Sequence, residues 1–245
     1  MIFVFQKPNK LPDAPSPSSA RAVAAAEARR NDPPKPETLC AIAAVRGEMA
    51  MNPELSFAEA EQARAESRKA YNQALALDSK HIPAYLGLAK SYSAIDDAEH
   101  AIKMYDKATD IKPRDANLWY DKALLQARFK DWDGSIASFR EAQKIDPDNR
   151  LYRRTLGMTQ ARAGKFDDAL ATLSKCMKEE EAHYTMARMY QHLDRSADAK
   201  EQLVLALKAR PTFVPAREML TQLEHPGPDA SNPIATVGHQ EPAAQ

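Results

Sequence analysis

Only a few residues of this 245-residue sequence have types and spacings that could support catalysis or metal binding. His183 follows Glu179 and Glu180 at a spacing that puts a histidine and a carboxylate on one side of a helix. A metal site needs more ligands than this pair supplies, so we interpret His183 as a histidine partly covered at a helix contact. Asp96–Asp97 and Asp167–Asp168 are paired carboxylates that precede helical patterns, where aspartates cap amides and favour the helix dipole.

The motifs that mark common enzyme classes are missing from the sequence. Its seven glycines do not cluster into a phosphate-binding loop, no serine sits in a hydrolase elbow, and no paired zinc-ligand motif is present. Cys40 and Cys176 are too few for a disulfide framework or a four-ligand zinc site. We therefore predict a protein that is not an enzyme and has no catalytic residues, no cofactor and no metal.

Composition limits the remaining classes of function. The 34 basic and 34 acidic residues cancel, which disfavours a nucleic-acid partner, and no segment approaches the roughly 20 apolar residues of a transmembrane helix. Read literally, the sequence predicts a cytoplasmic protein. However, Met1–Phe5 is apolar and precedes a proline-rich stretch, as in an exported protein whose start lies upstream, so a periplasmic or envelope-associated location stays open.

A frame of about 34 residues recurs between Ile82 and Pro211, and such a period is typical of a solenoid. Copies that begin at Ile82, Ala116, Arg150 and Glu180 share small residues at the eighth, twentieth and twenty-seventh places. These small residues are Ala89, Ala123, Gly157 and Ala187; Ala101, Ser135, Ala169 and Ala199; and Ala108, Ala142, Cys176 and Ala206. Antiparallel helices approach to about 8–10 Å only where the side chains at their crossing are short. We therefore interpret Cys176 as a packing residue rather than a nucleophile.

Larger residues fill other interior places of the frame. The fourth place holds Tyr85 and Trp119, but Arg153 and His183 in the last two copies. The twenty-fourth place holds Tyr105, Phe139, Leu173 and Leu203. The third copy loses four residues and its closing proline near 177–179, which predicts a shorter second helix or a tighter turn there.

This pattern resembles the tetratricopeptide repeat (TPR) family, whose repeat is a pair of antiparallel helices. The resemblance implies an all-α fold, a right-handed superhelical solenoid of antiparallel helix pairs with a C-terminal closing helix. It covers four repeats, at residues 82–115, 116–149, 150–179 and 180–211. Around them we expect a disordered Pro/Ala-rich arm (1–36), an atypical first helix pair (37–81), a capping helix (212–225) and a disordered tail (226–245). The helices of the atypical pair are expected at 37–51 and 57–77, the second behind a capping box of Ser56 and Glu59.

In this family the first helix of each pair lines the concave surface. The four expected first helices, at 83–95, 116–129, 150–163 and 180–193, carry eight basic and three acidic residues, whereas the second helices carry eleven of each. The resemblance places ten side chains in this peptide-binding groove: Lys90, Tyr120, Leu124, Arg128, Arg154, Met158, Arg162, Tyr184, Arg188 and His192. A basic groove of this kind favours acidic partners.

The sequence thus predicts a non-catalytic protein–protein interaction scaffold that binds a protein or extended peptide in the concave groove. The clamp with which one variant of the family holds a chaperone carboxylate is not expected, because Lys90, Leu124 and Thr155 stand at its places without the asparagines. Two alternatives stay open. One is an exported or lipid-anchored bacterial cell-envelope assembly factor, and the other is a solenoid that docks a catalytic subunit.

Overall fold

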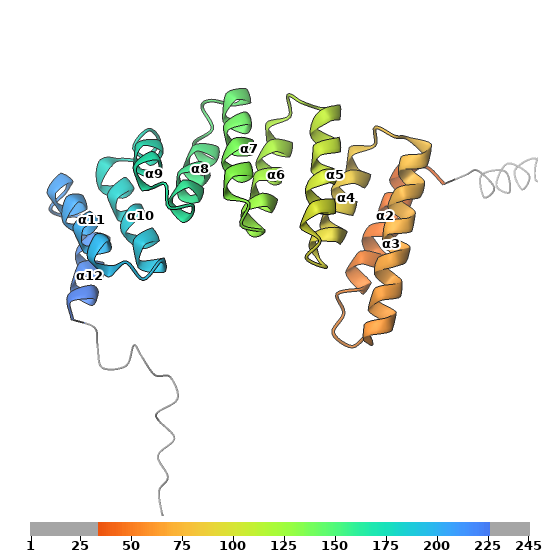
Figure 1. The fold of residues 1–245 in the computed structure, drawn as a ribbon, viewed down its shortest axis with the longest axis horizontal. Coiled ribbons are helices and arrows are strands. Elements are labelled where there is room, and N and C mark those ends of the chain that lie inside the picture. Colours follow the sequence, from red (N-terminus) through yellow and green to blue (C-terminus); the bar gives the residue numbers. More distant parts are fainter. Residues whose placement is uncertain (1–33, 226–245) are drawn as a thin grey trace, which may run out of the picture. The chain divides into compact units, whose positions relative to one another are not determined.

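The computed structural model describes residues 34–225, and every regular element in that range is an α-helix (Figure 1). The chain divides into two compact units, residues 1–79 and 80–245. The expected disordered arm and tail lie outside the described residues, except for positions 34–36. The all-α fold predicted from the sequence is confirmed, and each unit is described by itself below.

The first unit contains one helix pair, α2 (Pro36–Met49) and α3 (Phe57–Leu77). The predicted capping box is present, because the Glu59 amide donates to Ser56 Oγ at 3.3 Å and the Ser56 amide donates to Glu59 Oε2 at 2.9 Å. Where the two helices meet, the buried Ser67 hydroxyl donates to the Ala43 carbonyl at 2.7 Å. A serine fits this close contact because its hydroxyl finds an acceptor on the opposite helix.

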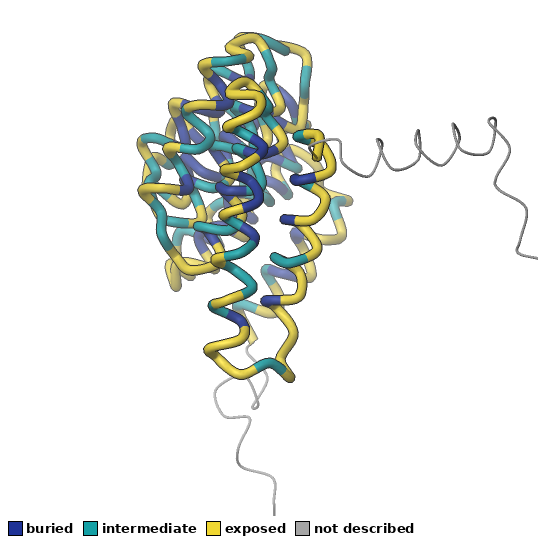
Figure 2. Tube along the Cα trace, turned by 90° about the vertical axis from the view of Figure 1, so that its right-hand side faces the viewer, coloured by how far each residue is buried: buried dark blue, intermediate teal, exposed yellow. Residues whose placement is uncertain are grey.

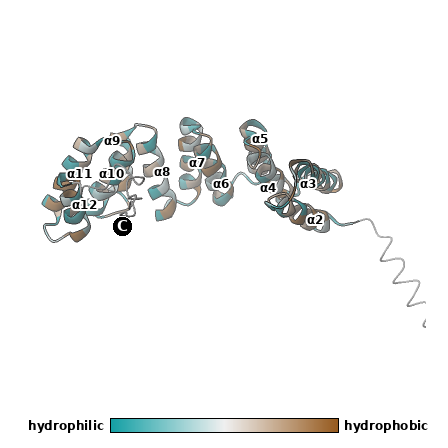
Figure 3. Ribbon diagram, turned by 90° about the horizontal axis from the view of Figure 1, so that it is seen from below, coloured by the Kyte–Doolittle hydropathy of each residue, from teal (hydrophilic) through white to brown (hydrophobic). Residues whose placement is uncertain are grey.

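The second unit is a run of helix pairs followed by one closing helix. Its first helices are α4 (Ile82–Ser93), α6 (Ala116–Arg128), α8 (Arg150–Arg162) and α10 (Glu179–His192). Its second helices are α5 (Ala98–Ile111), α7 (Trp132–Ile145), α9 (Phe166–Leu173) and α11 (Ser196–Ala209), and α12 (Val214–Glu224) follows α11. Each first helix packs on its second helix, and each second helix packs on the next first helix. Figure 3 shows the first and second helices of this unit in two separate layers.

The small residues of the frame lie in the interior, as predicted. The alanines at the eighth, twentieth and twenty-seventh places are all fully buried, and Ser135 is fully buried as well. Ser135 makes the same kind of hydrogen bond as Ser67 in the first unit, since its hydroxyl donates to the Ala123 carbonyl of the facing helix at 2.8 Å. Figure 2 shows buried residues at intervals along the helices and exposed residues in the turns between them.

Cys176 departs from the predicted pattern. The second helix of the third copy was expected to extend through it, but α9 ends at Leu173 after eight residues, so Cys176 lies in the following turn. The predicted shortening is therefore confirmed. The helix already ends at Leu173, before the point near 177–179 where the frame loses its four residues. Cys176 is still buried, with its sulfur 3.3 Å from the Leu173 carbonyl, so packing remains its role.

The turns within the four helix pairs share one backbone conformation. Asp96, Lys130, Gly164 and Asp194 each have a positive φ, between 56° and 77°, directly after the first helix has ended. A left-handed residue at this point closes a helix and lets the chain reverse. Three of the four are not glycine, and aspartate is one of the residues that tolerates this conformation best.

The residue after each left-handed position differs in what it does. Asp97 and Asp131 cap the next helix, accepting from the His100 and Gly134 amides at 3.1 and 3.0 Å. The capping role predicted for Asp167–Asp168 is wrong, because the α9 N-cap is Lys165 and makes no side-chain cap bond. Both aspartates lie in the first turn of α9, where their charge still favours the helix dipole.

The irregular fourth place of the frame has a common structural role. Trp119 Nε1 donates to the carbonyl of Pro113 at 3.0 Å, and Arg153 donates in the same way to Pro147. Arg217 of α12 donates to Pro211 at 2.6 Å. Each donor reaches back six residues to the proline that closes the previous repeat. His183 follows the junction that lacks this proline, and its Nδ1 lies 2.8 Å from Gln202 Oε1 instead.

One interior side chain makes the stability of the second unit sensitive to alkaline pH. Burial, with a smaller effect of the Asp121 carboxylate, raises the pKa of Tyr105 from 10.0 to about 12. Because the folded pKa lies above the unfolded one, the unfolded chain loses its proton first. Stability is therefore expected to fall as pH rises from about 10 to about 12 and to be unaffected by this group below that range.

Urea unfolding at a series of alkaline pH values tests this expectation. Tyr105→Phe should flatten the decline above the ordinary tyrosine pKa, because the variant has no phenol to ionise at that position. Asp121→Asn should shift the ultraviolet phenolate titration to lower pH. A decline as steep in Tyr105→Phe as in the wild type would contradict the assignment.

Candidate functional site

The ten side chains predicted to form the groove all lie on first helices of the second unit. Lys90 is on α4; Tyr120, Leu124 and Arg128 are on α6; Arg154, Met158 and Arg162 are on α8; Tyr184, Arg188 and His192 are on α10. Seven of them are exposed, while Tyr120, Met158 and Tyr184 are half-buried. The structure therefore separates the set into packed side chains and free ones.

Three of the ten belong to the packing between helices. The Tyr120 ring lies 5.5 Å from Phe139 and 4.9 Å from Tyr152, so it is held between α6, α7 and α8. Tyr184 makes an edge-on contact with Phe213 at 5.6 Å. Met158 packs against the buried cluster formed by α8, α9, α10 and α11. These side chains can form part of a binding surface, but they are fixed by their neighbours.

Arg128 is engaged in a cross-link between neighbouring repeats. Its Nη1 donates to Ser93 Oγ at 2.8 Å and its Nη2 lies 3.5 Å from Asp96 Oδ1, both near the end of α4. A second cross-link joins α6 to α8, where the Tyr152 hydroxyl donates to Asn117 Oδ1 at 2.7 Å. These bonds fix the spacing of successive first helices and occupy the Arg128 guanidinium.

Four cations of the predicted set remain free. Lys90, Arg154, Arg162 and Arg188 are exposed, and none forms a hydrogen bond or ion pair with another residue in 34–225. We call these four the cationic surface. Lys122, also on a first helix, does not belong to it because its side chain is only 13% exposed and its ammonium lies 2.8 Å from Asp106 Oδ1.

The observed helix bounds sharpen the charge contrast between the two kinds of helix. The first helices, α4, α6, α8 and α10, carry eight basic and four acidic residues. The second helices, α5, α7, α9 and α11, carry six basic and nine acidic residues. Positive charge is therefore concentrated on one helix of each pair.

The shortened α9 is accompanied by a pocket that the sequence pattern did not reveal. Its volume is about 340 Å³, and we call it the α8–α10 pocket. It is lined by Arg150, Leu151, Arg154, Cys176, Met177 and Glu181. Of these, only Arg154 was predicted as a site residue. The available signal was the loss of four residues near 177–179, which predicts a shorter second helix or a tighter turn but not a pocket.

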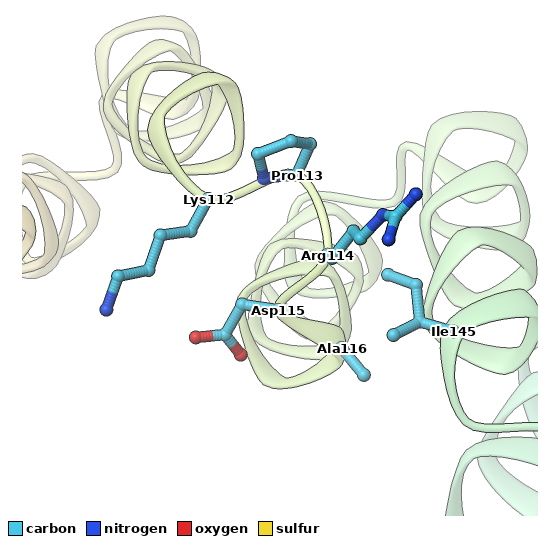
Figure 4. Close-up of a pocket in the computed structure, with 6 residues that line it drawn as sticks. All are labelled: Lys112, Pro113, Arg114, Asp115, Ala116 and Ile145. Atoms are coloured by element: carbon cyan, nitrogen blue, oxygen red, sulfur yellow. The ribbon is translucent and has the colours of Figure 1, made fainter.

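A second pocket, of about 590 Å³, lies at the junction of the first two repeats (Figure 4). It is formed by the turn between α5 and α6 and by the end of α7, with Lys112, Pro113, Arg114, Asp115, Ala116 and Ile145 as its lining. Arg114 and Ile145 stand on facing sides in Figure 4. Lys112 and Asp115 extend away from Ile145 into open space.

The other chemistry-bearing residues have structural surroundings. Residues 34–225 contain no group of three or more histidine, cysteine or acidic side chains that could hold a metal ion. Burial raises the pKa of the Cys176 thiol, with Arg153, Arg150 and Arg154 opposing the shift, so the thiol stays protonated at neutral pH. Among the helices of the described range, none has the length and apolar character needed to cross a membrane.

Comparison with known proteins gives one family model and several relatives that match parts of this chain. A family model described as tetratricopeptide repeat matches residues 82–115 and 116–149. The human mitochondrial import receptor subunit TOM70 is 28% identical over 95 residues, which are 38% of this chain and 16% of TOM70. The TPR repeat-containing protein YpiA of Bacillus subtilis is 27% identical over 143 residues, 56% of this chain and 33% of YpiA. The chain thus spans a third or less of the length of these relatives.

Solved structures match this chain at low sequence identity. YrrB, described as a TPR protein with an unusual peptide-binding site, aligns with a TM-score of 0.45 and 20% identity over 72% of this chain and 90% of its own. MamA aligns with a TM-score of 0.46 and 16% identity over 65% of this chain and 98% of its own. Residues 82–149 thus match two consecutive tetratricopeptide repeats, and helix pairs packed in the same order continue to residue 209.

Proposed function

We propose that this protein is a non-catalytic interaction scaffold that binds an acidic peptide segment of a partner protein along its first helices. The observation that carries the proposal is the cationic surface, four exposed side chains that have no partner among residues 34–225. Exposed cations that form no ion pair leave a positive potential, which steers acidic partners and raises the association rate.

Two further features support this function. The cross-links from Arg128 to Ser93 and from Tyr152 to Asn117 hold successive first helices at fixed spacing before any partner arrives. A preformed surface loses little freedom on binding, which favours affinity. Leu124, 41% exposed on α6, and the half-buried Tyr120 supply apolar contact area beside the cations.

The proposal predicts a strong effect of reversing charge on the first helices. A displayed library of random peptides, selected on the full chain, should be enriched in acidic sequences. For the enriched peptides, Arg162→Glu combined with Arg188→Glu should weaken binding by about tenfold or more, mainly through a slower association rate. Fluorescence polarisation gives the affinity, and stopped-flow mixing gives the rate.

A matched variant separates the surface from net charge. Lys107→Glu combined with Arg140→Glu makes the same change in charge at exposed positions of α5 and α7. This control should bind within about twofold of the wild type, because its changes lie on the second helices. Enriched peptides without excess acid, or equal loss of binding in both double variants, would end the proposal.

A further inference from the structure

The α8–α10 pocket follows from the shortening of one helix. The second helices α5, α7 and α11 have fourteen residues each, whereas α9 has eight. Because paired helices run antiparallel, the end of a second helix covers the beginning of its first helix. The missing turns of α9 therefore leave the start of α8 uncovered, and Arg150, Leu151 and Arg154 line the resulting pocket.

The wall opposite α8 is held in place by arginines. Arg150 Nε donates to the Cys176 carbonyl at 3.1 Å, and a second nitrogen of the same guanidinium donates to the same oxygen. Arg153 Nη1 donates to the Lys175 carbonyl at 3.4 Å. In a longer helix, the amides of the next turn would donate to these carbonyls. Here the arginine side chains donate to them instead. The turn is thereby tied to α8, and the pocket between them has fixed walls.

The lining combines apolar surface with one free cation. Leu151 is 55% exposed, and the half-buried Met177 packs against the buried cluster that includes Leu173 and Ala182. Arg154 is exposed and has no hydrogen bond or ion pair within residues 34–225. On the far wall, Glu181 lies at the start of α10, where its carboxylate accepts from the Lys178 amide at 3.4 Å.

We propose that the α8–α10 pocket is a specificity subsite that takes one bulky apolar side chain, with an adjacent carboxylate of the same segment paired to Arg154. Leu151 and Met177 supply the apolar walls, and charge complementarity at Arg154 selects an acidic neighbour. The volume of about 340 Å³ is at the small end of the range for ligand sites, which suits one side chain rather than a larger ligand. The proposal rests on the proposed function for the identity of the segment, but the pocket can be tested by itself.

The test uses the full chain with isotope-labelled methionine methyl groups and the blocked dipeptide N-acetyl-phenylalanyl-aspartate amide as probe. The Met177 methyl signal, assigned with Met177→Leu, should shift and saturate as the probe is added. Leu151→Asp should weaken this binding about tenfold, because it places a charge in the apolar wall. Leu193→Asp, at an exposed leucine outside the pocket, should leave the probe affinity unchanged. No shift of Met177, or equal weakening by both aspartate variants, would overturn the subsite.

Two comparisons distinguish the role of Arg154 from general charge. Arg154→Gln should weaken binding of the aspartate-containing probe several-fold while leaving N-acetyl-phenylalanine amide unaffected, since only the former has a carboxylate. Loss of both probes in Arg154→Gln would contradict the pairing. If Met177 responds to the dipeptide but acidic library peptides ignore Arg162→Glu and Arg188→Glu, the subsite stands and the proposed function fails. If those variants abolish peptide binding and Met177 never responds, the proposed function stands and the subsite fails.

Discussion

Phe139→Ala is expected to lower the free energy of unfolding of the second unit by about 3–5 kcal/mol. Phe139 is fully buried, and its cluster combines residues of α6, α7 and α8, with Ala123, Ile136 and Leu156 as buried neighbours. The ring also makes an edge contact with Tyr120 at a centroid distance of 5.5 Å. Truncation removes this apolar contact and leaves a cavity where two repeats meet. Urea unfolding followed by circular dichroism measures the change.

An exposed aliphatic residue of the same unit serves as the control. Val204 on α11 is 55% exposed, so Val204→Ala should change the unfolding free energy by less than about 0.5 kcal/mol. If the two variants were equally stable, Phe139 would not connect the second repeat to the third. A loss confined to a separate, earlier unfolding transition would show that the two repeats unfold independently.

Gly134→Ala is expected to destabilise the protein by about 1–3 kcal/mol, opposite in sign to what helix propensity predicts. Alanine in place of a helical glycine ordinarily stabilises by roughly 0.5–1 kcal/mol. At Gly134 an added Cβ would lie 2.1 Å from Asp131 Oδ2 and 2.3 Å from Gln126 Nε2, distances that real atoms do not tolerate. The methyl group must therefore displace Asp131, Gln126 or both.

The cost arises from the bonds that this displacement breaks. Asp131 caps α7 through the Gly134 amide at 3.0 Å and accepts from Gln126 Nε2 at 2.9 Å. Gln126 is buried, and its Oε1 accepts from the Ser138 hydroxyl at 2.6 Å. Ala137→Gly, at an exposed position of the same helix, calibrates propensity alone and should cost about 1 kcal/mol. A stabilised Gly134→Ala variant in thermal unfolding would show that the Asp131 and Gln126 contacts contribute little.

The regular helix pairs of this fold could be predicted from the positions of small side chains in the sequence. Alanines such as Ala89 and Ala123 recur where helices cross, and the structure buries them completely. The left-handed residues, among them Asp96 and Lys130, recur at the same interval, although their conformation was not predicted. Both features are local, since each depends on a single place in the repeat frame. The repeat period therefore locates them in every copy.

What the pattern missed depends on pairs of residues from different repeats. Arg128 is predicted to line the groove, and the sequence pattern does not show that the end of α4 offers Ser93 and Asp96 to its guanidinium. The α8–α10 pocket requires a missing helical turn and the arginines that hold the remaining turn, a combination visible only in three dimensions. The four cations of the cationic surface form no hydrogen bond or ion pair within residues 34–225, and the period of the sequence carries no information about such partners.

The bonds between repeats have a direction along the chain that bears on synthesis at the ribosome. Trp119 and Arg217 donate to carbonyls already made, and Arg128 and Tyr152 reach acceptors in the preceding repeat. A nascent first helix thus emerges next to acceptors that are already in place, which suits folding from the amino end while translation continues. Arg150 and Arg153 differ, since their acceptors at Cys176 and Lys175 emerge later. The third repeat must therefore wait for its own turn to leave the exit tunnel before it can close.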